Sequence, residues 1–171
     1  MQVSKSLFRK ISSRQHGFTI VELLIVIVII AILAAITIVA YNGIQERARY
    51  SSMKSDINSI NKAIQMYHAE NSSYPGSNTT GALVYSAGPN NTMSIPGLAP
   101  TYIAKMPSIL NDGKGGYYAY IVTANGANYK LVRLVPSGSE VPTIEQSDPG
   151  MDPVRGLRGW GVWSPACAST C

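Results

Sequence analysis

The hydrophobic pattern of the chain is dominated by one apolar segment, Phe18 to Tyr41. Of its 24 residues 21 are apolar, and only Thr19, Glu22 and Thr37 interrupt the run. About 20 helical residues cover the roughly 30 Å of hydrocarbon in a bilayer, so the apolar segment is long enough to span a membrane. It contains neither proline nor glycine. The pattern therefore predicts a continuous transmembrane helix.

The polar stretch after the apolar segment carries a single apolar stripe. Its members recur at alternating steps of three and four residues, which is typical of an amphipathic helix: Tyr50, Met53, Ile57, Ile60, Ile64 and Tyr67. Since no proline occurs before Pro75, the sequence predicts one helix over residues 18–71, with 18–41 as its membrane-spanning part. We interpret the stripe as packing against the rest of the chain; a coiled-coil surface for a partner is the alternative.

The first part of the soluble C-terminal region 72–171 is predicted to be irregular. Residues 72–115 are rich in Gly, Pro, Ser, Thr and Asn and poor in charge. This composition predicts a long surface loop region, with short helical or extended pieces near Leu83 and Tyr102. Long loops often carry function, but nothing in this one indicates a ligand.

The second part, residues 116–171, is predicted to form a sheet and a tail. Two runs rich in aromatic and β-branched residues, 117–123 and 129–135, flank the pair Asn125-Gly126, a pattern typical of a β-hairpin. An extended piece at 141–144 is expected to add a third strand. The predicted fold class is α+β, with one long N-terminal helix packed on a small antiparallel sheet.

The formal charge of +5 is concentrated in the first residues rather than spread over the chain. Four of the fourteen basic residues precede Gly17 and no acidic residue does: Lys5, Arg9, Lys10 and Arg14. We interpret residues 1–17 as a basic leader. Without the leader the chain has ten basic and nine acidic residues, which does not favour a dedicated nucleic-acid-binding region.

Glu22 is the unusual residue of the apolar segment. A carboxylate inside a transmembrane helix costs of order a few kcal/mol at the bilayer centre and less near an end, so it usually has a partner. Cleavage after Gly17 would create one, the α-amine of Phe18, one helical turn away. Glu22 could pair with that amine in its own chain, favour the helix N-terminus, or reach the amine of a neighbouring subunit in an assembly.

The run from Gly17 to Ile27, with a basic leader, Gly, Phe, three residues, Glu and a long apolar helix, resembles the class III signal of type IV prepilins and type II secretion pseudopilins. The resemblance covers about the first quarter of the chain and implies a pilin-like fold. It implies that prepilin peptidase cleaves between Gly17 and Phe18 and N-methylates Phe18. It also implies that Glu22 pairs with a neighbouring Phe18 amine during assembly.

The resemblance further implies a structural protein rather than an enzyme, without a cofactor. The precursor would lie in the cytoplasmic (inner) membrane, leader inside and C-terminal region outside, and then enter an extracellular filament. Its partners would be other pilin subunits, prepilin peptidase, an assembly ATPase and a membrane platform, with nucleic acid only as a fibre-level ligand. The long neutral loop region and the cysteine pair favour an extended pilus. A secretion pseudopilus is the alternative, and a monomeric membrane-anchored binding module is a third hypothesis.

Three features of residues 116–171 leave alternatives open. Cys167 and Cys171 are the only cysteines, and in an exported protein they are expected to close a small disulfide loop rather than to bind a metal. Trp160 and Trp163 are interpreted as covering the core, or as exposed binding groups. Glu145, Asp148 and Asp152 could bind calcium as in some major pseudopilins, but their spacing fits no EF-hand loop. We therefore interpret them as solvated turn carboxylates and expect no metal.

Overall fold

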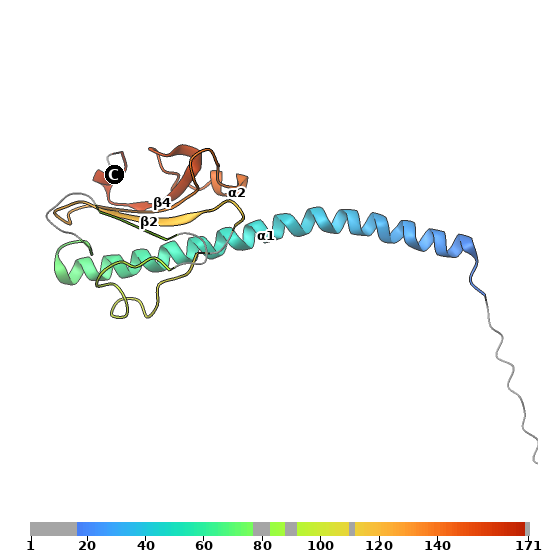
Figure 1. Cartoon of the computed structure of the whole chain (residues 1–171), viewed down its shortest axis with the longest axis horizontal. Helices are drawn as coiled ribbons and strands as arrows, with labels where there is room; N and C mark the ends of the chain where they lie inside the picture. The colour runs from blue at the N-terminus through green and yellow to red at the C-terminus, as the bar shows by residue number, and fades with distance from the viewer. Residues whose placement is uncertain (1–16, 77–82, 88–91, 110–111, 170–171) are drawn as a thin grey trace, which may run out of the picture. The chain divides into compact units, whose positions relative to one another are not determined.

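The computed structural model describes residues 17–76, 83–87, 92–109 and 112–169. The chain divides into two units, Met1–Tyr41 and Asn42–Cys171. We call the second unit the head. Figure 1 shows the order of the elements along the chain, from helix α1 through the strands to the C-terminal tail.

Helix α1, Ile20–Asn71, contributes to both units, and the predicted long helix is confirmed. It passes through Gly43 without a break. The helix ends where Ser72 takes a positive φ of 55° and donates its backbone N–H to the His68 carbonyl at 2.8 Å. Pro75 follows, which cannot continue a helix. The predicted stop is therefore confirmed.

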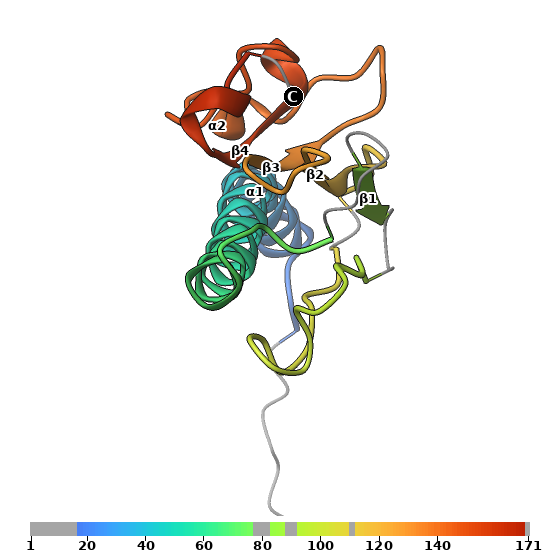
Figure 2. The ribbon, with the colours of Figure 1, turned by 90° about the vertical axis from the view of Figure 1, so that its left-hand side faces the viewer.

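The described residues of the head form one antiparallel sheet of four strands in the order β1-β2-β3-β4. The strands are β1 (Leu83–Ala87), β2 (Tyr117–Val122), β3 (Tyr129–Leu134) and β4 (Gly159–Trp163). Within the head, α1 runs along one face of this sheet (Figure 2).

The hairpin between β2 and β3 is the one that the sequence predicts. Tyr117 pairs with Leu134 at its open end, and Val122 with Tyr129 next to the turn. Gly126 takes a φ of 65° in the turn, a region that favours glycine. The Asn125 side-chain oxygen accepts the Ala127 N–H at 3.1 Å, so the turn residues act as their types suggest.

The core of the head lies between α1 and the sheet. The middle of the apolar stripe is buried, with Ile60 and Ile64 fully so, and its two end tyrosines are partly buried. The stripe packs in one cluster with inward-facing side chains of β2 and β3: Tyr118, Tyr120, Val122, Tyr129 and Leu131. The interpretation of the stripe as core packing is therefore confirmed. A smaller cluster of Ala119, Val132 and Leu134 lies on the opposite face of the sheet, with Tyr117 and Trp163 partly buried against it.

The predicted third strand at 141–144 is wrong. Val141 is followed by Pro142, which has no N–H for a ladder, and Thr143–Gln146 form the short helix α2. The sheet is instead extended on both sides of the hairpin. β1 pairs with β2 over Leu83–Ala87, where a short extended piece is predicted, and β4 pairs with β3.

The tail after α2 is compact. Two short 3-10 helices, η1 (Gly156–Arg158) and η2 (Pro165–Cys167), bracket β4. Trp160 is only 2 % exposed and packs edge-on against Tyr50 of α1, with ring centroids 5.5 Å apart. The alternative that Trp160 is an exposed binding group is therefore wrong, because its indole fills the core.

Candidate functional site

The start of α1 is closed by a reciprocal hydrogen-bonded cap. The Thr19 hydroxyl accepts the Glu22 N–H at 3.2 Å, and the Glu22 carboxylate accepts the Thr19 N–H at 2.8 Å and the Thr19 hydroxyl at 2.7 Å. This is a capping box, in which a Thr and a Glu three residues later satisfy each other's free N–H groups. Glu22 therefore has a local structural role at the helix start. The Thr-x-x-Glu spacing was its sequence signal, and our sequence analysis missed it.

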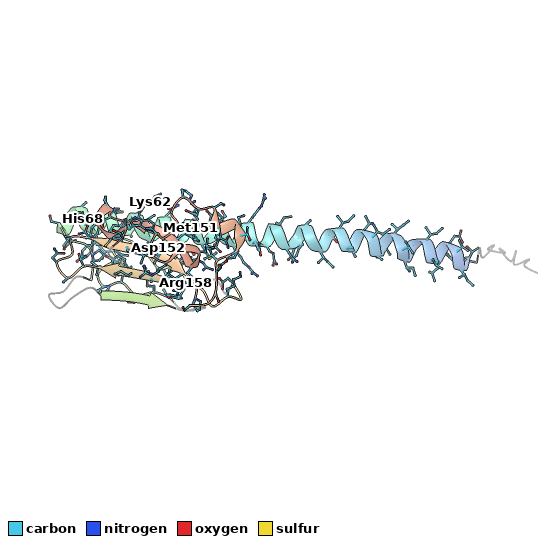
Figure 3. All side chains as sticks on the ribbon, turned by 90° about the horizontal axis from the view of Figure 1, so that it is seen from above. Lys62, His68, Met151, Asp152 and Arg158 are labelled. Atoms are coloured by element: carbon cyan, nitrogen blue, oxygen red, sulfur yellow. The ribbon has the colours of Figure 1, made fainter. Side chains whose placement is uncertain are left out.

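The apolar segment exposes its side chains on every side. Each residue of it whose side chain the structure describes is exposed, and Figure 3 shows these side chains standing out all round the helix. Among the described residues, one helix has the length and composition to cross a membrane, and it is the helix that contains this segment. A surface of this kind has to be covered by lipid or by other subunits, because large exposed apolar patches are rare on soluble monomers.

Besides Thr19, the apolar segment contains two polar side chains, Thr37 and Glu22, and their situations differ. Thr37 donates its hydroxyl to the carbonyls of Leu33 and Ala34 at 3.0 and 2.9 Å, so its polarity is satisfied inside the helix. Glu22 has no ion-pair partner among residues 17–76, 83–87, 92–109 and 112–169. Its charge is therefore the one in the segment that remains to be balanced.

The expected processing site lies directly before the helix. Gly17 and Phe18 precede α1 in non-helical backbone and are exposed, while residues 1–16 of the leader lie outside the described residues. No internal contact of the described chain covers the Gly17–Phe18 bond. Cleavage at this bond and methylation of Phe18 stay predictions.

The predicted disulfide falls partly outside the described part of the chain. Cys167 is fully buried at the end of η2, and its N–H is bonded to the Ser164 carbonyl at 2.9 Å. Cys171 lies outside the described residues. The Cys167–Cys171 bridge therefore remains a prediction.

The acidic residues near the C-terminus are not solvated, so that interpretation is wrong. Glu145, Asp148 and Asp152 are 1 %, 7 % and 0 % exposed. Burial alone would raise the pKa of Asp148, but hydrogen bonds from Lys54, Tyr50 and the Gly150 N–H outweigh burial and hold the pKa below its ordinary value. Burial raises the pKa of Glu145, against the opposing effect of Arg133 and Trp160. These carboxylates are structural members of the head.

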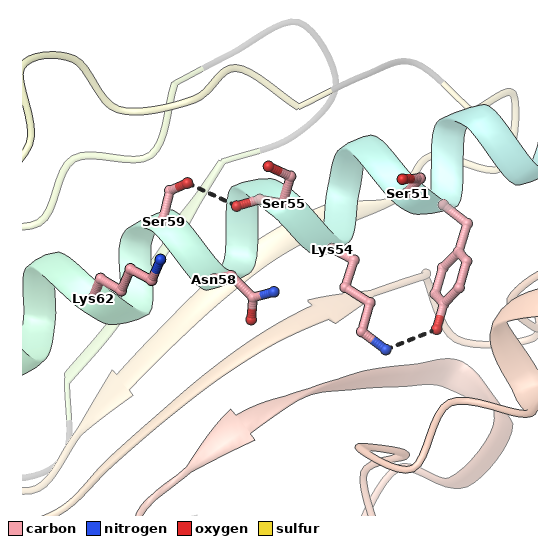
Figure 4. Close-up of a pocket in the computed structure, with 7 residues that line it drawn as sticks. Ser51, Lys54, Ser55, Asn58, Ser59 and Lys62 are labelled. Atoms are coloured by element: carbon pink, nitrogen blue, oxygen red, sulfur yellow. Dashed lines mark hydrogen bonds between the residues drawn. The ribbon is translucent and has the colours of Figure 1, made fainter.

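A shallow polar groove runs along the head part of α1 (Figure 4). Its lining consists of one tyrosine, two lysines, three serines and one asparagine: Tyr50, Ser51, Lys54, Ser55, Asn58, Ser59 and Lys62. Lys54 bonds the Tyr50 hydroxyl at 3.2 Å, and Ser59 donates to the Ser55 carbonyl at 2.8 Å. The lining holds no carboxylate or imidazole to act as a general base toward a hydroxyl. The groove therefore offers polar contacts and no recognisable catalytic pair.

A helix that is apolar and exposed at its start, and packed on a small antiparallel sheet farther along, defines a pilin-like subunit. A prokaryotic N-terminal methylation motif matches residues 12–38, which contain the Gly17–Phe18 junction and Glu22. The family model of type II secretion system protein G matches residues 40–148, more than half of the chain. The chain therefore belongs to the type II secretion system protein G family, whose members are pseudopilins.

Individual relatives agree with this assignment. The chain is 29% identical over 135 residues to the type II secretion system core protein G of Escherichia coli K12, which spans 74% of this chain and 86% of the relative. The corresponding protein of Pseudomonas aeruginosa is 27% identical over 137 residues, or 80% of this chain and 94% of the relative. That of Pectobacterium carotovorum is 40% identical over 62 residues, or 36% of this chain. No solved structure gives a significant match.

These comparisons correct our preference between two kinds of filament. The loop region and the cysteine pair favoured an extended pilus, but the match over residues 40–148 is to a secretion pseudopilin. Loop composition and a terminal cysteine pair therefore did not identify the kind of filament in this chain. The comparisons support the secretion pseudopilus, which the sequence left as the alternative.

Proposed function

We propose that this chain is a structural subunit that polymerises, through the apolar segment of α1, into the pseudopilus of a type II secretion system. The observation that carries the proposal is the exposure of this segment together with its one carboxylate, Glu22, which has no ion-pair partner among the described residues. Membrane lipid covers the apolar surface before assembly, and the helices of neighbouring subunits cover it afterwards. The family assignment of the head supports the choice of a secretion pseudopilus.

The precursor is proposed to lie in the inner membrane, with its leader in the cytoplasm and its head outside. Prepilin peptidase removes the leader after Gly17 and methylates the Phe18 amine. An assembly ATPase and a membrane platform then move the mature subunit into the filament, where it contacts other pseudopilins. The chain itself is proposed to catalyse no reaction in this process.

Glu22 is proposed to guide assembly by charge, in addition to capping its own helix. The carboxylate of an incoming subunit meets the Phe18 amine of a neighbour, so both charges are neutralised in an apolar environment, where an unpaired charge is costly. The pairing also sets the axial position of one subunit against the next. A capping residue alone would need no negative charge, since glutamine also completes a capping box.

The first prediction tests this role with two substitutions. Glu22→Ala removes both cap and charge, whereas Glu22→Gln retains the capping geometry and removes only the charge. We expect both variants to insert and to be cleaved normally, and both to enter sheared filaments at least tenfold less than the wild type, by quantitative immunoblotting. Thr37→Ala is the matched control, because Thr37 is a polar residue of the same segment that is satisfied within the helix.

The outcomes separate the hypotheses. Wild-type incorporation of Glu22→Gln together with loss of Glu22→Ala would show that the cap, not the charge, is required. Equal incorporation of all variants would remove Glu22 from assembly altogether. Cross-linking in cells adds a further test, since a monomeric anchor would give no ladder of multimers even for the wild type.

A further inference from the structure

The head encloses four carboxylates that a divalent cation could in principle use. Glu145, Asp148 and Asp152 are buried, and the side chain of Asp112 is 5 % exposed. Carboxylate oxygens at a turn are typical ligands of calcium, and calcium is what the resemblance to major pseudopilins raised for these residues. The contacts of each carboxylate decide whether its oxygens are available to a metal.

Asp152 already has both oxygens engaged. Its Oδ1 accepts a hydrogen bond from Lys130 Nζ at 2.9 Å and one from the Val154 N–H at 2.9 Å. Its Oδ2 accepts Arg155 Nη1 at 2.8 Å. The side chains of Lys130 and Asp152 are both 0 % exposed. A metal ion at Asp152 would have to displace the Lys130 ammonium and leave it buried without its counter-charge, which is strongly unfavourable.

The other three carboxylates are neutralised in the same way. Arg133 contacts Asp112 through Nη2 and Glu145 through Nε, the latter at 3.2 Å. Lys54 Nζ lies 2.9 Å from Asp148 Oδ2. Four carboxylates thus face four cationic side chains: Lys54, Lys130, Arg133 and Arg155. Within the described residues no group of three potential ligands is arranged to hold a metal ion.

Lys130 also contacts several separate segments of the head, as a bound structural ion would. Its Nζ reaches the Asp152 carboxylate, donates to the Ala168 carbonyl at 3.3 Å and lies 5.2 Å from the centroid of the Trp163 ring. Strand β3 is thereby linked to the turn before η1, to β4 and to the C-terminal tail. One ammonium group contacts three separate segments, as a structural cation does.

We infer that Lys130 and Arg133 supply from within the chain the positive charge that calcium would supply, and that the head is stable without a bound divalent cation. The four described carboxylates do not fit a calcium site, because each of them already contacts a cationic side chain of the protein. The inference concerns the head alone and does not depend on the filament to which the chain is assigned.

The test uses the full-length chain in detergent micelles, with unfolding followed by tryptophan fluorescence, to which the buried Trp160 and the partly buried Trp163 both contribute. After removal of metals with EDTA, we expect the thermal midpoint to be unchanged when calcium chloride is added, compared with magnesium chloride at equal ionic strength. We also expect calcium alone to give no saturable binding heat in calorimetry. A saturable rise of the midpoint with calcium, absent with magnesium, would overturn the inference.

Two variants test the internal cation directly. Lys130→Met keeps the length of the side chain but removes the fully buried one of the two cations that contact Asp152, so its midpoint should fall by several degrees. Lys130→Met combined with Asp152→Asn should recover part of that loss, because residue 152, which is buried, then carries no charge that needs the Lys130 ammonium. Lys62→Met, at an exposed lysine of α1, is the control and should change nothing. If Lys130→Met were as stable as the wild type, the ammonium would not be the structural cation. If it did not fold, the metal titration of the wild type would still decide.

Discussion

Single charged residues link segments of the head that are distant in sequence, and Asp148 is an example. Its carboxylate accepts Lys54 Nζ at 2.9 Å and the Gly150 N–H at 2.7 Å, and the Tyr50 hydroxyl also donates to it. Hydrogen bonds to a charged group contribute about 1.5–3 kcal/mol each when both partners are well placed. These contacts attach the turn after α2 to helix α1, and they depend on the ionised form of the Asp148 carboxyl group.

The second prediction follows from the lowered pKa of Asp148. A carboxyl whose pKa is lower in the folded than in the unfolded state stabilises the fold above the unfolded pKa, near 3.8, and this contribution is lost as the pH falls through the folded pKa. Asp148→Asn should therefore lower the free energy of unfolding by about 1–3 kcal/mol at pH 7. The difference from the wild type should shrink progressively below pH 3.8.

Urea unfolding at a series of pH values measures this difference. Glu140→Gln, at an exposed carboxyl, is the control and should follow the wild-type curve throughout. A constant difference between Asp148→Asn and the wild type from pH 7 to pH 2.5 would show that the charge of Asp148 is not what stabilises the turn.

At the scale of elements, strand β4 leaves no room for a side chain where Gly161 faces β3. A β-carbon on Gly161 of β4 would lie 2.1 Å from the Leu131 carbonyl oxygen and 2.7 Å from the Val132 Cα of β3. Gly161 also donates its N–H to the Gly150 carbonyl at 2.8 Å. The absence of a side chain is thus what permits β4 to lie between β3 and the turn that precedes it in sequence.

The third prediction concerns this close packing. Gly161→Ala should destabilise the head by at least about 1–3 kcal/mol, the usual cost of overpacking, because the contacting atoms are backbone and cannot move aside. Gly43→Ala is the matched control, since a β-carbon there would meet nothing within 4 Å. The control should be neutral or stabilising by up to about 1 kcal/mol, because alanine favours a helix interior over glycine. Equal midpoints for both variants in urea unfolding would contradict the prediction.

Local sequence patterns could predict the elements whose own residues favour the observed conformation. Helix α1 and the β2–β3 hairpin follow from the apolar period, the first proline at Pro75 and the Asn125-Gly126 turn. Strand β4 was missed because two glycines interrupt the strand-favouring residues of its sequence Gly-Trp-Gly-Val-Trp, and glycine is depleted in strands. Its glycines are explained only by the neighbouring backbone.

The acidic residues of the candidate site also differ in whether the sequence alone could identify their roles. Glu22 stands out because a carboxylate is rare in an apolar run, so sequence alone could single it out. The buried acids could not be recognised, because Asp148 meets Lys54 and Asp152 meets Lys130 across long stretches of chain. A carboxylate looks solvated in sequence until its distant partner is known.

For the whole molecule, the position of the expected cleavage site means that removal of the leader would not affect the head. The Gly17–Phe18 bond lies next to the apolar segment and not in the head, so removal of the leader would leave every described contact of the head intact. The net charge would fall with it, from fourteen basic residues against nine acidic to ten against nine. Processing would change the N-terminus and its charge without requiring the head to refold.

The fourth prediction tests this processing. In cells with prepilin peptidase the mature protein should begin with N-methylated Phe18, as measured by intact mass and N-terminal peptide mapping. Gly17→Leu should remain uncleaved, because a bulky residue replaces the small one before the bond, whereas Gly17→Ala should retain measurable cleavage. A mature N-terminus beyond Ala35 would instead indicate an ordinary secretory signal.

The buried ammonium of Lys130 has a consequence for the chemical reactivity of the chain. Amine-reactive esters modify lysines in proportion to their accessibility, and Lys62, Lys105 and Lys114 are exposed whereas Lys130 is not. In native protein Lys130 should resist acylation while the three exposed lysines react, and it should become labelled only when β3 separates from the turn before η1. Mass spectrometry of the labelled peptides would thus follow the unfolding of the head inside intact membranes or filaments, where no purified sample is needed.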